Sequence, residues 1–117
     1  MSVKHIAFTS YPVKDIERAR KFYEGALGLK RGGGDSQGQW VEYYLDNGCF
    51  AVTTFFQGTG NGIGFEVDDV DAMEKKLLAS GGKSKKAAFD TGVCRMAVLH
   101  DPDGNVLMLH KKNADRA

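Results

Sequence analysis

The pattern of apolar positions predicts two helices built on one plan. From Asp15 to Gly28 and again from Asp69 to Gly82, apolar residues recur at the three- and four-residue spacing of a single helix face. Each segment begins at an Asp, which accepts backbone N–H groups, and ends at a Gly, which favours a left-handed helix end. The two Asp residues are 54 positions apart (69 − 15), so one short unit is used twice. The sets expected to face inward are Ile16, Ala19, Phe22, Tyr23, Ala26 and Leu27 in the first helix, and Val70, Met73, Leu77 and Leu78 in the second.

A strand hairpin is the strongest signal in the first half of the chain. Residues 40–56, WVEYYLDNGCFAVTTFF, are two strand-like runs around Asn47-Gly48, a dipeptide that favours a type I′ turn. With these as the turn residues, Glu42 lies opposite Thr53 and Trp40 opposite Phe55. One face then suits packing under a helix: Val41, Tyr43, Leu45, Phe50, Val52, Thr54 and Phe56. The other places aromatics around one carboxylate, as in a ligand-binding wall: Trp40, Glu42, Tyr44, Ala51, Thr53 and Phe55.

The second half of the chain repeats this plan. GFEV, residues 64–67, is a strand before the second helix, as residues 3–11 are before the first. RMAVLH and NVLMLH flank Asp101-Pro-Asp-Gly104, which predicts a second hairpin. Each module is therefore a strand, a helix and two or three antiparallel strands. We expect one α+β domain, with module one over about residues 1–57 and module two over about residues 62–112.

Three segments have no clear period. Gly32 to Gly38 predicts a mobile loop, which either lies over an opening or only joins two elements. Residues 58–64, GTGNGIG, predict a flexible linker between the modules, and their glycines fit no dinucleotide-binding motif. Residues 83–90 are ambiguous between strand and coil.

Composition narrows the possible functions. With 117 residues, 42% of them apolar and 26% charged, the chain is typical of a soluble globular domain. A net charge of +1, with Lys and Arg spread along the sequence, argues against nucleic-acid binding. No apolar run approaches the roughly 18 residues that span a bilayer, and we expect a cytoplasmic protein without membrane contact. Cys49 and Cys94 lack CxxC spacing, which predicts buried reduced thiols.

Three segments together resemble a known family. They are V-x-D-I-x-x-A-x-x-F-Y-x-x-x-L-G (Val13–Gly28), G-F-E-V-D-D (Gly64–Asp69) and D-P-D-G-N-x-L (Asp101–Leu107). This pattern is similar to the glyoxalase / bleomycin-resistance / extradiol-dioxygenase superfamily, also called vicinal oxygen chelate. The resemblance implies two tandem βαβββ modules whose curved mixed sheet forms a concave cleft, usually in a homodimer. In many members the cleft holds a divalent metal on His and Glu.

The same resemblance places the metal-ligand positions at Phe8, Thr53, Gly62 and Met108. None of these residues supplies the oxygen or imidazole donors that a zinc, nickel, manganese or iron site requires. We therefore expect no metal and no other cofactor. His5 lies three residues before Phe8, so its side chain should face the other way, and only a bulge near Tyr11-Pro12 would turn it into the cleft.

The residues left to line the cleft predict a ligand site. The expected ligand-binding residues are Phe8, Trp40, Glu42, Tyr44, Thr53, Phe55, Met108 and His110, and the candidate catalytic residues are Glu42, His110 and Arg95. Our first hypothesis is a metal-free dimer that binds a small aromatic or hydrophobic organic molecule. A second is a metal-independent isomerase or lyase with Glu42 as general base, or a metal-dependent lyase or dioxygenase if His5 enters the cleft. A third is an interaction surface without a pocket, because Trp and Tyr are also enriched at interfaces.

Overall fold

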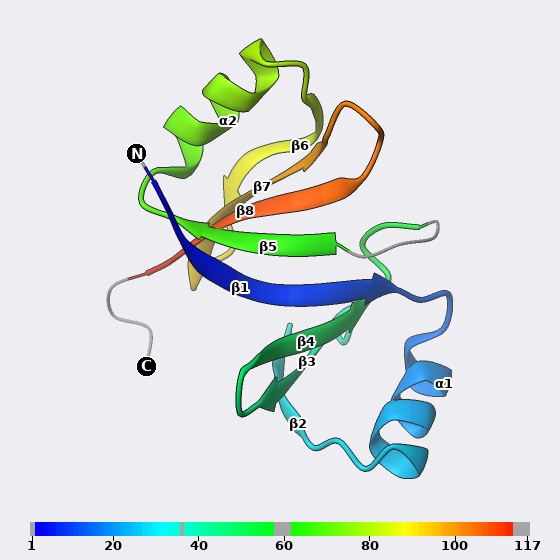
Figure 1. The fold of residues 1–117 in the computed structure, drawn as a ribbon. Coiled ribbons are helices and arrows are strands. Elements are labelled where there is room, and N and C mark those ends of the chain that lie inside the picture. The colour runs from blue at the N-terminus through cyan, green and yellow to red at the C-terminus, as the bar shows by residue number, and fades with distance from the viewer. Residues whose placement is uncertain (1, 36, 58–61, 114–117) are drawn as a thin grey trace. The chain divides into compact units, whose positions relative to one another are not determined.

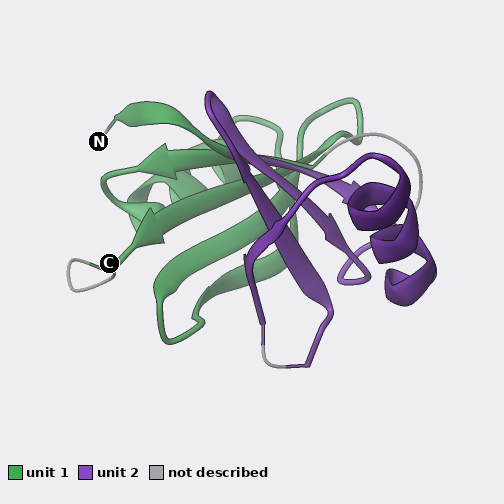
Figure 2. Cartoon of the chain, turned by 90° about the horizontal axis from the view of Figure 1, so that it is seen from below, with its two compact units in different colours: residues 1–7, 62–117 green, residues 8–61 purple. Residues whose placement is uncertain are grey.

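The computed structural model of this protein describes residues 2–35, 37–57 and 62–113. The chain divides into two compact units, shown in Figure 2: unit 1 comprises residues 1–7 and 62–117, and unit 2 comprises residues 8–61. Part of the expected linker, residues 58–61, lies outside the described residues. Its other part, Gly62–Gly64, is the start of a strand, so the expectation of a flexible linker over those three residues was wrong.

The expected α+β class is confirmed, because the elements follow the order strand, helix, three strands twice (Figure 1). The first set is β1 (Val3–Pro12), α1 (Ile16–Arg20) continued by η1 (Lys21–Ala26), β2 (Arg31–Gly34), β3 (Trp40–Leu45) and β4 (Gly48–Thr53). The second set is β5 (Gly62–Val67), α2 (Val70–Ala79), β6 (Lys83–Asp90), β7 (Cys94–His100) and β8 (Val106–Lys112). Unit 2 has the strand order β2-β3-β4-β1, in which β1 runs parallel to β4, and unit 1 has the order β5-β8-β7-β6.

The first helix is α-helical only over its first five residues. It begins as predicted, since the Asp15 carboxylate accepts the Arg18 N–H at 3.1 Å, and it ends before Gly28, whose φ is +85°. From Lys21 onward it is the π-helix η1, in which hydrogen bonds span five residues, as from the Leu27 N–H to the Phe22 oxygen. Because a π-helix has more residues per turn than an α-helix, side chains in η1 no longer point along the face predicted for an α-helix. Phe22, Ala26 and Leu27 are therefore exposed, contrary to prediction.

The second helix explains the first by comparison. The Asp69 carboxylate accepts the Ala72 N–H at 3.0 Å, as predicted, but the left-handed residue at the helix end is Gly81, with φ +101°, and not Gly82. The cap-to-glycine distance is thus 12 residues here (81 − 69) and 13 in the first helix (28 − 15). One additional residue in the same structural unit accounts for the π-helix. Val70 and Met73 are buried as expected, whereas Leu78 is exposed.

The first hairpin forms with a different register. Its turn residues are Asp46 and Asn47, and Leu45 pairs with Gly48, so each predicted pair is shifted by two positions. Neither Asn47 nor Gly48 has a positive φ, and the expected type I′ turn was therefore wrong. Because side chains alternate with a period of two, this shift leaves every residue on its predicted face.

The second hairpin is confirmed, since β7 and β8 pair antiparallel from His100↔Val106 to Cys94↔Lys112 around the Asp101–Gly104 turn. Residues 83–90, ambiguous in the sequence, form β6 on the open side of β7. The predicted loop over Gly32 to Gly38 was wrong in its first part, because Arg31–Gly34 is the strand β2 paired with β3. Strand pairing uses backbone groups, which glycines possess without showing any side-chain period.

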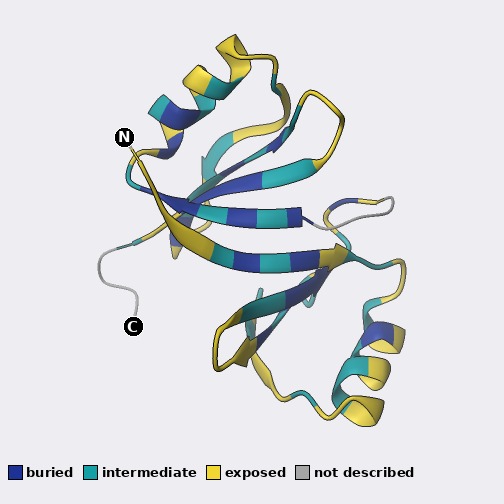
Figure 3. Ribbon diagram, in the orientation of Figure 1, coloured by how far each residue is buried: buried dark blue, intermediate teal, exposed yellow. Residues whose placement is uncertain are grey.

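Each unit has its own apolar core on the helix side of its strands, and β1 is exposed over residues 3–6 and buried at Phe8 and Ser10 (Figure 3). The buried core of unit 2 consists of Ala19, Val41, Tyr43 and Val52, and that of unit 1 of Val67, Val70, Met73, Ala97, Leu99 and Leu109. In the described part of the chain, no helix is long and apolar enough to cross a membrane. The predicted site residues other than Arg95 lie on or next to the opposite strand faces.

Candidate functional site

An aromatic cluster forms on the strand face of unit 2 that α1 does not cover. The Trp40 ring meets the Phe8 ring edge-to-face, with centroids 5.0 Å apart and an interplanar angle of 82°. On its other side it stacks with Phe55, at 6.3 Å and 25°. Phe8 is buried, Trp40 is half-buried, and Phe55 is 57% exposed. The three rings thus run from the interior to the surface, and the structure brings them together as the sequence predicted.

The Glu42 carboxylate is held by two aromatic donors. Trp40 Nε1–H donates to Oε2 and the Tyr44 hydroxyl donates to Oε1, both at 2.7 Å. Trp40, Glu42 and Tyr44 alternate along β3, so this arrangement lies along one row of the strand face. Each oxygen therefore has a fixed partner, and the carboxylate has a defined orientation beside the Trp40–Phe55 stack.

The glycines of β2 make room for this row. A Cβ atom on Gly32 would lie 2.4 Å from the Tyr44 ring, and one on Gly33 would lie 2.7 Å from the Tyr44 hydroxyl and 3.1 Å from Glu42 Oε1. Only a strand without side chains at these positions lets the tyrosine lie against its backbone. The glycines predicted to form a loop therefore form the strand backbone against which the side chains of Tyr44 and Glu42 pack.

Thr53 supports the aromatic cluster from beneath. Its hydroxyl donates to the Gln39 carbonyl at 2.8 Å and accepts the Phe55 N–H at 3.0 Å, and the residue is fully buried. Both hydrogen bonds are to backbone groups of this module. The side chain thus fixes the path of the chain into Phe55.

The metal positions implied by the family resemblance do not fit a metal. Phe8, Gly62 and Met108 offer carbon or a thioether, and the Thr53 hydroxyl is taken up as just described. Within residues 2–35, 37–57 and 62–113, no group of three His, Cys, Asp or Glu side chains is arranged to hold an ion. β1 pairs regularly with β4 from Thr9 to Pro12, so the bulge that would turn His5 is not present. His5 itself is exposed and interacts electrostatically with Glu66.

The other predicted residues lie in unit 1, where Met108 and His110 share a face of β8. His110 is buried rather than solvated, and its Nδ1 lies 2.6 Å from Glu66 Oε1. Burial opposes the charge on Glu66, but hydrogen bonds from His110 and the Lys112 N–H lower the pKa of this carboxyl below its usual value. Glu66 was not among the predicted site residues, because only the β5–β8 pairing places it opposite His110.

Arg95 does not join His110 and Met108. It alternates with Cys94 and Met96 along β7 and lies with α2, where it donates to Asp71 from Nε and Nη2 at 2.7 and 2.8 Å, and to Asp90 at 3.0 Å. The Asp71 hydrogen bonds raise the pKa of the Arg95 guanidinium further above its already high value. Arg95 therefore belongs to an ion-pair cluster on the α2 side of β7, apart from His110 and Met108.

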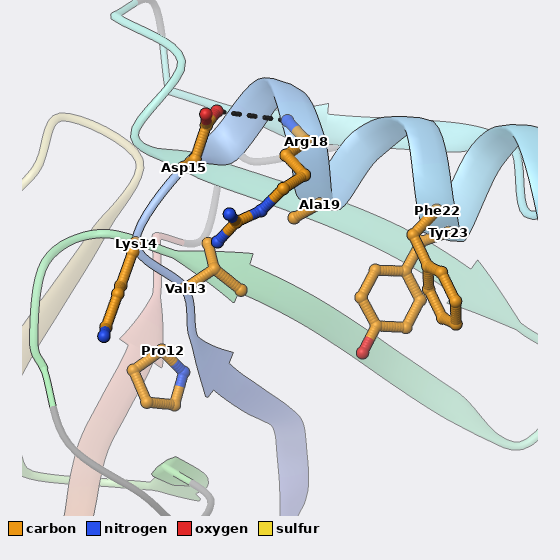
Figure 4. Close-up of a pocket in the computed structure, with 8 residues that line it drawn as sticks. All are labelled: Pro12, Val13, Lys14, Asp15, Arg18, Ala19, Phe22 and Tyr23. Carbon is orange, nitrogen blue, oxygen red and sulfur yellow. Dashed lines mark hydrogen bonds between the residues drawn. The ribbon is translucent and has the colours of Figure 1, made fainter.

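A cavity of about 450 Å³ lies elsewhere in unit 2 (Figure 4). Its lining runs from the end of β1 into the first helix and consists of Pro12, Val13, Lys14, Asp15, Arg18, Ala19, Phe22 and Tyr23. None of the predicted site residues lines this cavity. Its lining also has no arrangement comparable with the Glu42 carboxylate held by Trp40 and Tyr44. Its polar groups include the helix cap itself, since Asp15 accepts from the Arg18 N–H.

Comparison with known proteins agrees with this architecture. A methylmalonyl-CoA epimerase from Streptomyces coelicolor, solved with 2-nitronate-propionyl-CoA, is 17% identical with a TM-score of 0.70 and 99% of each chain covered. A superfamily member from Vibrio splendidus is 14% identical (TM-score 0.67; 95% of this chain and 100% of that chain). A 2,3-dioxygenase from a Pseudomonas species is 22% identical (TM-score 0.64), with 96% of this chain covering 42% of that chain. At these identities the likeness concerns the fold.

The family itself is shown by a family model. The comparison with curated proteins gives no significant match. The model described as Glyoxalase/Bleomycin resistance protein/Dioxygenase superfamily matches residues 2–109, nearly the whole chain. The two βαβββ modules are consistent with that match. This chain is a member of the Glyoxalase/Bleomycin resistance protein/Dioxygenase superfamily.

Proposed function

We propose that this protein is a metal-free member of its superfamily that binds a small aromatic or hydrophobic organic molecule on the strand face of unit 2. The observation that carries the proposal is the Glu42 carboxylate, fixed by Trp40 and Tyr44 beside a partly exposed aromatic stack. Aromatic side chains supply contact area, and a placed polar group fixes orientation, which are the two components of a small-molecule site. The ligand class is a flat ring system with a hydroxyl or cationic group for Glu42.

The exposure of the rings supports a ligand more than a purely structural cluster. Phe55 and Tyr44 are each more than half exposed although both are held by neighbours in the same face. Covering Phe55 with a stacked ring would remove apolar surface from water and add an aromatic pair worth about 0.5–1.5 kcal/mol beyond its area. The site is thus organised before any ligand arrives.

A second candidate is a metal-independent isomerase or lyase in which Glu42 removes a proton. The same two hydrogen bonds to Glu42 support this candidate, because a general base must be held at a fixed place beside its substrate. Each Glu42 oxygen already accepts one hydrogen bond, so a substrate proton would have to approach a remaining lone pair. This geometry suits an orienting acceptor better than a base, and we rank binding first.

We also propose that the protein works as a cytoplasmic homodimer, as the family resemblance implies. Sedimentation at micromolar concentration measures this directly. A monomeric sedimentation coefficient would contradict the proposed homodimer. It would not affect the proposed ligand site, which lies within unit 2.

The only tryptophan of the chain makes binding measurable, because Trp40 is itself part of the wall. We would titrate aromatic carboxylates, phenols and aromatic amines while following Trp40 emission and the melting temperature. A true ligand should change the emission and raise the melting temperature by mass action. Phe55→Ala should weaken that ligand about tenfold, or about 1.4 kcal/mol.

Phe22→Ala is the matched control, since Phe22 is 61% exposed, much like Phe55, but lies on η1. If Phe55→Ala and Phe22→Ala weakened ligand binding equally, the proposed location of the ligand site beside Phe55 would be contradicted. Glu42→Gln separates the two candidates: binding that persists while a turnover disappears would favour the enzyme. Absence of turnover in either form favours the binding protein.

A further inference from the structure

Three side chains with related chemistry meet on one strand face of unit 1, away from α2. The strand order β5-β8-β7 places His110 on the middle strand, with its direct partners Glu66 on β5 and Met96 on β7. Cys94 lies two residues from Met96 along β7 and therefore shares its face. Cys94 and His110 are diagonal neighbours across the β7–β8 pairing, and their side chains interact. His110 thus lies between a carboxylate on one side and a thiol on the other.

The Glu66 contact fixes which nitrogen of His110 faces the thiol. Glu66 Oε1 lies 2.6 Å from Nδ1, and an ionised carboxylate can only accept, so Nδ1–H is the donor. Nε2 then remains for the β7 side, where Cys94 lies. A carboxylate that orients an imidazole toward a thiol is the arrangement by which proteins form a nucleophilic thiolate.

We propose that Cys94 is a reactive thiol, activated by His110 and oriented by Glu66, which small hydroperoxides oxidise to a sulfenic acid. The site lies in unit 1 and makes no use of the aromatic wall proposed above. Cys94, His110 and Glu66 are only 5%, 8% and 6% exposed, and this burial favours an oxidant as small as hydrogen peroxide over bulky thiol reagents. Cys94 begins β7 directly after the exposed residues 91–93, which gives such a molecule a short path.

Two further observations support a thiolate at this position. Burial opposes charge on His110, yet its interactions with Cys94 and Glu66 raise the pKa of the imidazole above its usual value, which favours an imidazolium beside the thiolate. The Thr91 hydroxyl lies 3.0 Å from Cys94 Sγ and also accepts the Cys94 N–H at 3.1 Å. This hydroxyl donates to the Cys94 carbonyl oxygen at 3.2 Å, and turning its proton toward a thiolate would hold the sulfur in place.

The reaction balances without any other reagent. The thiol proton passes to His110 Nε2, and the thiolate sulfur attacks one oxygen of hydrogen peroxide. The S–O bond forms as the O–O bond breaks, sulfur loses two electrons, and the peroxide is reduced. The departing hydroxide takes the proton from the imidazolium and leaves as water. The products are the Cys94 sulfenic acid, one water molecule and neutral His110.

The two cysteines of the native chain provide an internal comparison. Cys49 is half-buried and therefore more accessible than Cys94, whereas Cys94 has the imidazole of His110 and, beyond it, the carboxylate of Glu66 beside it. We would add hydrogen peroxide to the folded protein at pH 7, remove the excess with catalase, unfold the protein in urea that contains dimedone as a sulfenic acid trap, and measure the adduct on each cysteine by peptide mass spectrometry. Cys94 should be oxidised at least ten times faster than Cys49. Oxidation of Cys49 at an equal or higher rate, or oxidation of Cys94 only when peroxide is added to the unfolded protein, would overturn the proposal.

Variants then test the cause. Glu66→Gln and His110→Gln should each lower the Cys94 rate at least tenfold, whereas Asp71→Asn, which removes a carboxylate of the same unit, should leave it unchanged. Circular dichroism reports whether each variant is folded. If a variant does not fold, the comparison of the two cysteines in the native chain still decides. Folded Glu66→Gln and His110→Gln proteins with the native rate would refute activation by this pair.

Discussion

Single residues show how a buried polar group can set the local structure. Tyr43 is fully buried in the core of unit 2, and its hydroxyl donates to Glu24 Oε2 at 2.9 Å. Glu24 also accepts from Arg20 at 2.7 and 3.1 Å, and the Arg20 hydrogen bond is the main reason why the pKa of Glu24 is lowered. A tyrosine hydroxyl in a core needs such a partner. The π-helix carries Glu24, so the helix geometry and the Tyr43 bond belong together.

This bond predicts a loss of stability in alkali. Burial, and then the Glu24 hydrogen bond, raise the pKa of Tyr43 from 10.0 to about 12. Between these pH values Tyr43 ionises in the unfolded chain and not in the folded chain. This ionisation stabilises the unfolded state, so the free energy of unfolding falls as pH rises from 10 to 12. Tyr43→Phe should make this fall shallower by up to about 1.4 kcal/mol per pH unit. Urea unfolding at several pH values measures the slope.

Tyr11→Phe is the control for this experiment, because Tyr11 is an exposed tyrosine of the same chain. A Tyr43→Phe protein with the native slope would show that Tyr43 ionises alike in the folded and unfolded chains.

The residue-level site could be predicted in part. Alternation along residues 40–56 placed Trp40, Glu42 and Tyr44 on one face, and a register error of two residues did not matter because faces repeat every two residues. The hydrogen bonds from Trp40 and Tyr44 to Glu42 could not be foreseen, since they depend on side-chain rotamers. The glycines beneath Tyr44 were misread because a glycine strand carries no side-chain pattern.

At the scale of elements, the first helix shows a limit of periodicity. Ile16, Ala19 and Tyr23 fit an α-helical face, and they do pack on the core of unit 2. The next apolar residues fit it as well in the sequence, but η1 turns them outward. The sequence feature that indicates the π-helix is the one extra residue between Asp15 and Gly28. This extra residue can be recognised only once Gly81 is known to be the counterpart of Gly28.

The β2 strand gives a prediction about a whole element. Gly34 has φ +148°, and a Cβ there would lie 2.2 Å from the Trp40 carbonyl oxygen, which is backbone and cannot turn away. Gly34→Ala should therefore separate β2 from β3 and lower the free energy of unfolding by more than 2 kcal/mol, on the order of strain and overpacking combined. A change in Trp40 emission should accompany it. Urea unfolding followed by fluorescence measures both.

Gly38→Ala is the matched control, because Gly38 also has a positive φ, +73°, but open space around it. It should cost only the left-handed backbone conformation, about 1–2 kcal/mol. Equal losses from the two substitutions would mean that the contact between Gly34 and the Trp40 carbonyl does not control β2.

For the whole molecule, the repeat carried the sequence interpretation furthest. Asp15 and Asp69 marked two modules of one plan, and the family match over residues 2–109 agrees with that reading. The same offset of 54 linked Phe8 to Gly62 and showed positions without metal ligands. What the sequence could not reveal was the pair Glu66 and His110, 44 residues apart, because only the parallel pairing of β5 and β8 brings them together. A pattern within one element says little about contacts between elements.

This pair predicts how the stability of the protein depends on pH. The pKa of His110 is raised, so its contribution is complete below the usual value of 6.5 and is lost as pH rises through the raised pKa. The pKa of Glu66 is lowered, so its contribution is complete above 4.5 and is lost as pH falls. The ion pair should therefore stabilise the fold most between about pH 4.5 and 6.5. Glu66→Gln should cost about 3–5 kcal/mol in that window, the usual loss when a buried pair keeps one charge.

A double-mutant cycle isolates the pair from all other titrating groups. Glu66→Gln, His110→Gln and the double variant, unfolded in urea from pH 5 to pH 9, give a coupling free energy at each pH. Coupling should be largest near pH 5–6 and decline toward pH 9 as His110 loses its proton. Because Cys94 helps to raise the pKa of His110, the decline should begin at lower pH in a Cys94→Ser background. A coupling free energy that stays constant from pH 5 to pH 9 would mean that His110 remains neutral in the folded protein, and that Glu66 orients the imidazole by a hydrogen bond without an ion pair.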